Sequence, residues 1–182
     1  MSHPSQALLR TAARSPRELE SLLVRGDTPS IDALTGYEFR GLNHGPLAGA
    51  LRIRKFVKGF DRSGGGAFGF NCRADQNAID GPWKALPEDD DAHRFGFFSV
   101  TPVDPRARDN THLHAVLLDY GRGQGRPRDP VRALRDYVVR ITPGSDDLLL
   151  GKAYVAAGPA RLPVGFFLLE RRRPLERSAA AR

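Results

Sequence analysis

The segment Leu148–Glu170, which reads LLLGKAYVAAGPARLPVGFFLLE, decides the fold class of this chain. Two apolar runs, Leu148–Ala156 and Pro163–Glu170, each contain a single charged residue and are separated by a turn signal at Gly158-Pro159. Short apolar runs on either side of a turn predict a β-hairpin whose strands are covered on both faces. In a small barrel, one face of each strand would point into the lumen and the other would lie under a helix.

Strand patterns recur along the rest of the chain, separated by turn residues such as those of Ser63–Gly66 and Pro143–Asp146. The segments with strand patterns are 37–40, 55–60, 67–73, 94–101, 112–120, 136–142, 148–156 and 162–170. Eight short strands with few helices among them predict a mainly β fold, a single antiparallel β-barrel of about eight strands.

Helix signals lie near the N-terminus. Ser15 has the chemistry of an N-cap and Glu18 can complete a capping box, so a helix is predicted over 16–25. Gly26 stands where a left-handed C-terminal cap belongs. A second, short amphipathic helix is expected near 46–54. The N-terminal helix is the expected cover for the outer face of the hairpin.

The domain organisation expected from the 182 residues is simple, because this length suits one domain. Residues 1–14 are predicted to form a flexible or helical arm, 15–173 the single barrel domain, and 174–182 a disordered basic tail. The oligomeric state is not predicted.

Composition narrows the class of protein. No apolar run approaches the roughly 20 residues of a membrane-spanning helix, and 1–15 lacks the apolar stretch of a signal peptide, so a cytoplasmic location without a membrane span is expected. The one cysteine, Cys72, cannot form an internal disulfide and is expected to be a buried hydrophobe. The net charge of +7 is only a weak indication of nucleic-acid binding. Of the 28 basic residues 24 are Arg, and many of them lie near the ends of the chain, where solvated arginines are expected.

Several segments resemble the bacterial families with a GXWXG-type N-terminal domain and, more loosely, lipocalin-type ligand barrels. Tyr37 stands at the first glycine of that motif and Phe39 at the tryptophan, while Gly41 is kept. The segments that carry the resemblance are 32–41, 46–49, 55–56, 136–140, 147–152 and 166–170. The resemblance implies a β-rich, barrel-like fold and carries no catalytic residues over to this chain.

The sequence signals for a metal site or an anion site are weak. His112 and His114 share a face of a predicted strand, but a third ligand with suitable spacing is missing, so a hydrogen-bonded or solvated pair is predicted, with no metal and no cofactor. Glu88–Asp91 is interpreted as a solvated acidic loop, and Gly64–Gly66 as a hairpin turn. The Arg122–Arg128 loop joins two strands, so nucleic-acid binding is unlikely.

Polar residues within apolar strands are the more informative signal, because buried polar groups need partners. One interpretation is an internal network, for instance Lys152 with Asp119 or Asp136. The other is a pocket in which polar groups orient an apolar molecule between the aromatic side chains of Phe39, Phe70 and Trp83. The candidate ligand-binding residues are Phe39, Asn71, Trp83, Tyr120, Lys152 and Tyr154.

The leading hypothesis is a β-barrel that binds a small apolar or amphipathic molecule, entered at the end closed by the long 74–93 connection, which contains Trp83. The first alternative is an enzyme that uses the cavity for proton transfer or isomerisation, with Lys152, Tyr154 or the two histidines, although its catalytic residues are unknown. The second is a basic interaction module for nucleic acid or an acidic partner.

Overall fold

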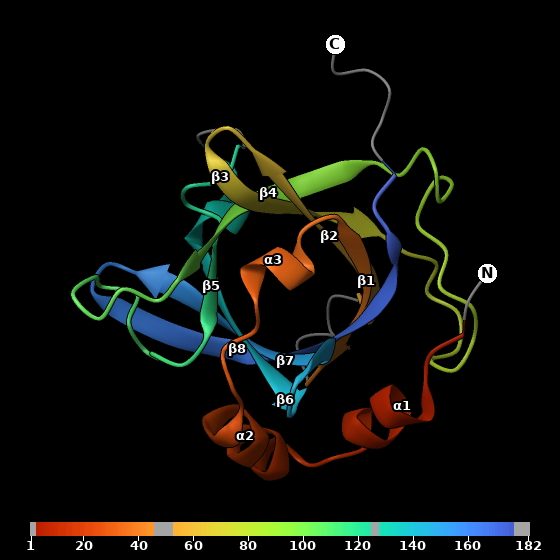
Figure 1. The fold of residues 1–182 in the computed structure, drawn as a ribbon, viewed down its shortest axis with the longest axis horizontal. Helices are drawn as coiled ribbons and strands as arrows, with labels where there is room; N and C mark the ends of the chain where they lie inside the picture. Colours follow the sequence, from red (N-terminus) through yellow and green to blue (C-terminus); the bar gives the residue numbers. More distant parts are fainter. Residues whose placement is uncertain (1–2, 46–52, 125–127, 177–182) are drawn as a thin grey trace.

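A computed structural model describes residues 3–45, 53–124 and 128–176, and shows a closed antiparallel barrel (Figure 1). Each strand pairs with the next one in sequence, and the first pairs with the last. The strands are β1 (Tyr37–His44), β2 (Lys55–Ser63), β3 (Gly66–Arg73), β4 (Arg94–Pro102), β5 (Val116–Asp119), β6 (Leu134–Thr142), β7 (Ser145–Ala157) and β8 (Ala160–Pro174). The predicted mainly β, eight-stranded barrel is confirmed.

The hairpin predicted from Leu148–Glu170 is the β7–β8 pair, in which Leu148 lies opposite Glu170. The two strands are longer than predicted, and β8 continues to Pro174. As expected, both faces are covered. Leu149 and Leu169 belong to the core inside the barrel, whereas Leu150 packs outside it against the N-terminal helices.

Two strand predictions need correction. The segment 112–120 is extended only from Val116, because a turn precedes it in which the Ala115 amide donates to the His112 carbonyl at 3.1 Å. The first strand, predicted over 37–40, continues to His44. The Gly64–Gly66 region is the tight turn between β2 and β3, as predicted.

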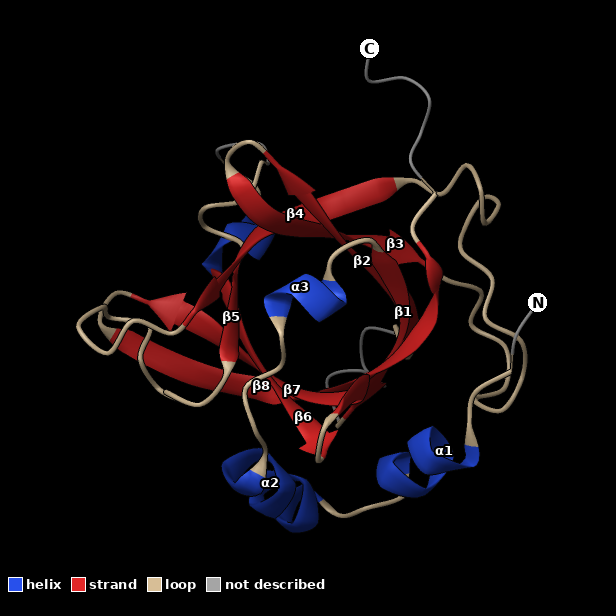
Figure 2. Cartoon of the chain, viewed as in Figure 1, coloured by secondary structure: helices blue, strands red, loops and turns tan. Residues whose placement is uncertain are grey.

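Two short helices, α1 (Gln6–Ala12) and α2 (Pro16–Arg25), lie outside the barrel wall (Figure 2). The predicted helix over 16–25 and its capping box are confirmed. Three buried leucines fix the helices to the wall: Leu8, Leu19 and Leu23.

The predicted left-handed cap at Gly26 is wrong: its φ is −70°, since the chain leaves the helix extended and bridges to β6. Of the helix expected near 46–54, residues 46–52 lie outside the described residues, and Ile53 and Arg54 are not helical.

A third helix, α3 (Ile31–Leu34), lies across one end of the barrel (Figure 1). Leu34 is fully buried in the interior core together with Phe39 and Phe60. The helix directly precedes β1, so it covers the end where β1 begins. The opposite end, where β1 ends and β2 begins, is therefore the one at which a cavity can open.

Candidate functional site

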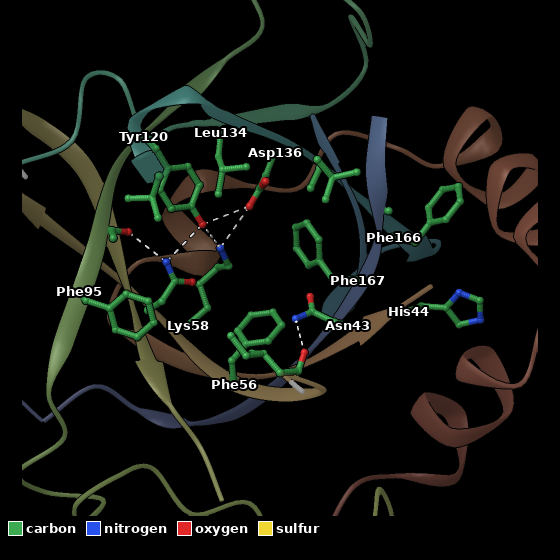
Figure 3. A pocket seen from close by; sticks show the side chains of 17 residues that line it. Asn43, His44, Phe56, Lys58, Phe95, Tyr120, Leu134, Asp136, Phe166 and Phe167 are labelled. Atoms are coloured by element: carbon green, nitrogen blue, oxygen red, sulfur yellow. Dashed lines mark hydrogen bonds and ion pairs between the residues drawn. The ribbon is translucent and has the colours of Figure 1, made fainter. Parts of the chain in front are cut away.

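A cavity of about 280 Å³ occupies the barrel end opposite α3 (Figure 3). Its walls are largely apolar and include Phe56, Leu134 and Phe167. Two further lining residues, Ile53 and Phe95, are 47% and 43% exposed, so apolar side chains also face solvent at this end. An apolar hollow with an apolar rim suits a molecule that leaves water on binding.

Four polar side chains meet at this cavity, and we call them the polar cluster: Lys58, Asn71, Tyr120 and Asp136. Lys58 donates to Tyr120 Oη at 2.7 Å and to Asp136 Oδ2 at 3.3 Å. Tyr120 in turn donates to Asp136 Oδ2 at 3.2 Å. Asn71 Nδ2 donates to Tyr120 Oη at 3.2 Å and to the Gly96 carbonyl at 3.0 Å. The result is one connected network against an apolar cavity.

Strand alternation explains why these side chains point inward. In β2, Phe56, Lys58 and Phe60 occupy alternate positions, and both phenylalanines belong to the interior core. Lys58 pairs directly with Asn71 of β3, which places the two side chains on the same face of the sheet. Asp136 likewise alternates with the interior residues Leu134 and Val138 of β6.

The charges of the polar cluster are removed from water. The side chains of Lys58 and Asp136 are 2% and 6% exposed. Burial lowers the pKa of the Lys58 ammonium, although the Asp136 carboxylate partly offsets this. Burial also raises the pKa of Asp136, against the opposing effect of Lys58, and it raises the pKa of Tyr120 together with the charge of Asp136.

Aromatic rings surround the lysine. The Lys58 ammonium lies 4.5 Å from the ring centroid of Phe98 and 5.3 Å from that of Phe167. Rings at this distance stabilise a cation, which helps to hold a charge inside the barrel.

Of the predicted site residues, the structure brings two to the cavity, Asn71 and Tyr120. Phe39 lies inside the barrel, with its ring edge-on to Phe60 at 5.3 Å, and belongs to the packed part of the core rather than to the cavity lining. Trp83 lies outside, where its indole N–H donates to the Phe56 carbonyl at 2.9 Å. The Lys55 ammonium lies over its ring, 3.9 Å from the centroid. No described residue of the 74–93 connection lines the cavity.

Lys152 and Tyr154 also lie outside, on the face of β7 that α2 covers. Lys152 donates to Glu20 Oε2 at 2.6 Å, so its predicted pairing with Asp119 or Asp136 is wrong. Tyr154 Oη lies 2.8 Å from His112 Nε2. The predicted network inside the barrel exists, but its lysine is Lys58.

Sequence reasoning missed Lys58, which is not among the predicted ligand-binding residues. The available signal was the segment Phe56–Phe60, FVKGF, in which Lys58 lies two residues from each phenylalanine. Residues two apart in a strand lie on the same face. That pattern places the lysine on the buried face.

Each of the two histidines has a hydrogen-bond partner of its own. His114 Nε2 lies 2.9 Å from the Leu23 carbonyl, and His112 contacts Tyr154. Within residues 3–45, 53–124 and 128–176, no group of three or more metal-ligating side chains is found.

The prediction of a solvated acidic loop is confirmed for Glu88, Asp90 and Asp91, which are exposed, but not for Asp89. The prediction of solvated C-terminal arginines is wrong for Arg172. Arg172 is 3% exposed and contacts both Asp89 and Glu38, while Arg173 contacts Asp90. β8 therefore brings Arg172 to Asp89 and Arg173 to Asp90 of the 74–93 connection, and Asp90 stays 72% exposed. In the other basic segment, Arg122 is exposed, and 125–127 lie outside the described residues.

Comparison with protein-family models, with curated proteins and with solved structures finds no match to this chain. The resemblance to GXWXG-type families thus stays a prediction. Among the described helices, none has the length and apolar character needed to cross a membrane.

Proposed function

We propose that this protein binds a small apolar or amphipathic molecule inside its barrel, as a lipocalin-like ligand carrier does. The observation that carries the proposal is the cavity itself, an apolar hollow with the polar cluster at its wall. Ligand sites in proteins typically combine apolar walls with a few polar groups that fix orientation.

The buried ion pair supports this proposal. Replacing a buried ion pair by apolar residues of similar volume is often neutral or stabilising, so stability alone is a weak reason for Lys58 and Asp136 to face each other inside a barrel. Binding of a ligand by these two groups would explain why both are buried inside the barrel.

The test is displacement of an apolar fluorescent probe, N-phenyl-1-naphthylamine, by a lipophilic compound library, with native mass spectrometry to identify bound molecules. An extrinsic probe is needed because Trp83 lies outside the barrel. Ala153 lines the cavity, so Ala153→Phe should fill it and abolish probe binding. Ala156→Phe, in the same strand but away from the lining, is the matched control and should bind normally. Wild-type protein that takes up neither probe nor library compound would contradict the proposal.

A second candidate is acid–base catalysis in the same cavity, because a carboxylate whose pKa is raised by burial lies beside a lysine and a tyrosine. Asp136 would take a proton from carbon next to the carbonyl of an apolar ketone and return one to it. Incubation with such ketones in D₂O should then exchange those protons, as followed by NMR. Exchange at the same rate in Asp136→Asn would exclude this role.

A further inference from the structure

We infer that the ligand is an uncharged apolar molecule carrying one hydrogen-bond donor, such as an alcohol or phenol hydroxyl, and that Asp136 Oδ1 accepts from it. The inference rests on the proposed function, since it names the class of molecule that the cavity selects.

The first argument is an unused acceptor. Asp136 is 4% exposed, and its Oδ2 accepts from both Lys58 and Tyr120. Its Oδ1 is buried and has no hydrogen-bond partner among the described residues. A buried acceptor without a partner costs free energy, which a donor on the ligand would recover. Asp136 is one of the residues that line the cavity, so its side chain lies at the wall that a ligand would meet (Figure 3).

The second argument concerns donors. Tyr120 donates its single proton to Asp136, and Asn71 uses its amide group on Gly96 and Tyr120. Of the three N–H groups of Lys58, two have acceptors among the described residues, which leaves one N–H group as a donor to a ligand. The polar cluster is therefore better matched by a hydroxyl, which donates and can also accept, than by an ether or ketone, which only accepts.

The third argument is charge. The opposite charges of Lys58 and Asp136 cancel, and His44 is the only other residue in the described lining that can carry charge near neutral pH. A carboxylate ligand would meet Asp136, an ammonium ligand would meet Lys58, and each would lose its hydration without a spare counter-charge. A neutral ligand avoids that cost.

The experiment is isothermal titration calorimetry with four molecules of one apolar frame: naphthalene, 2-methoxynaphthalene, 2-naphthol and 2-naphthoate. We expect 2-naphthol to bind about tenfold or more tightly than 2-methoxynaphthalene, because a hydrogen bond to a charged group is worth at least that factor. We expect 2-naphthoate to bind most weakly. Equal affinities, or tightest binding of 2-naphthoate, would overturn the inference while leaving the proposed function intact. Binding of none of the four would also overturn the inference, while the displacement assay with the probe and the library still decides the proposed function.

Variants assign the preference to Asp136. Asp136→Asn should reduce the advantage of 2-naphthol over 2-methoxynaphthalene to less than threefold, whereas Lys152→Met, outside the barrel, should keep it. Because Asp136→Asn leaves Lys58 buried without its counter-charge, the double variant Lys58→Met/Asp136→Leu provides a second test. It should bind naphthalene and lose the preference. A preference that survives in either variant would contradict the role of Asp136.

Discussion

Lys58 and Lys152 look alike in the sequence, each flanked on both sides by uncharged residues of an apolar strand segment, yet their surroundings are opposite. Lys58 points into the barrel and pairs with Asp136, whose side chain is also buried. Lys152 points outward to Glu20, whose side chain is 43% exposed. Water can therefore stabilise the charges of the outer pair but not those of the inner one.

This difference predicts unequal costs of removing the two lysines. Lys58→Met should destabilise the protein by about 3 to 5 kcal/mol, because it leaves a buried carboxylate without its partner. Lys152→Met should cost about 1 kcal/mol or less, as for partly exposed pairs. Urea denaturation of both variants measures this, and similar losses would show that Asp136 is solvated after all.

Asp109 gives a pH-dependent prediction. Burial by itself would raise the pKa of Asp109, but hydrogen bonds and charges of Arg161 and Arg135 outweigh burial and hold the pKa below its usual value of 3.8. A pKa lowered by folding means that the stabilisation is complete above pH 3.8 and is lost as the pH falls through the lower folded-state value.

The Asp109→Asn variant should thus lose about 1 to 3 kcal/mol at neutral pH and differ less from wild type in strong acid. Chemical denaturation at a series of pH values tests this. A loss that stays constant down to the most acidic pH would show that the contribution of Asp109 is not ionic.

At the scale of strands, four glycines are paired with phenylalanines of the neighbouring strand. Each glycine lies directly opposite a phenylalanine whose ring occupies the space of a Cβ atom. The pairs are Gly41–Phe56, Gly59–Phe70, Gly69–Phe98 and Gly151–Phe167. Such pairs let a small barrel curve sharply without leaving the strand face empty.

Gly41→Ala should therefore destabilise the barrel by about 1 to 3 kcal/mol, because the added Cβ would lie 2.2 Å from the Phe56 ring. Gly64→Ala is the matched control: its Cβ would meet nothing within 4 Å, and the cost should stay within about 0.5 kcal/mol. Thermal denaturation compares the two. If Phe56→Leu does not reduce the cost of Gly41→Ala, the clash is not its cause.

A second element-scale feature is the attachment of the 74–93 connection to β8. Arg172 donates to Glu38 Oε2 at 2.8 Å and to the Trp83 carbonyl at 2.9 Å, and it also contacts Asp89. One buried guanidinium thus joins β1, β8 and the connection.

Arg172→Met should release this connection, increasing its rates of hydrogen exchange and proteolysis, and should cost about 3 kcal/mol. Arg62→Met removes an exposed ion pair with Asp32 and should cost less than about 1 kcal/mol. Unchanged exchange in 74–93 of the Arg172 variant would show that Trp83 packing alone holds the segment.

At the scale of the molecule, the barrel is asymmetric along its axis. The α3 end is filled by Leu34, Phe39 and Phe60, whereas the other end holds the cavity. α1 and α2 cover the outer face of β6 to β8, so this part of the wall is buried on both sides.

Leu34→Ala should create a cavity at the filled end and cost about 2 to 4 kcal/mol. It should leave binding of the apolar probe at the opposite end within about twofold of wild type. Denaturation and probe titration measure the two effects, and a large loss of probe binding in a folded variant would mean that the ends are coupled.

The sequence by itself determined the hairpin, the number and approximate places of the strands, the α2 helix and the barrel class, because these depend on local periodicity, turn residues and capping. It also indicated that polar groups lie within buried strands. Only the tertiary structure decided which polar groups meet. Lys58 lies 62 residues from Tyr120 and 78 from Asp136, and closure of the barrel with its particular register brings them together while turning Lys152 outward. Alternation assigns a residue to one of two faces, but which face is interior depends on how all eight strands pair.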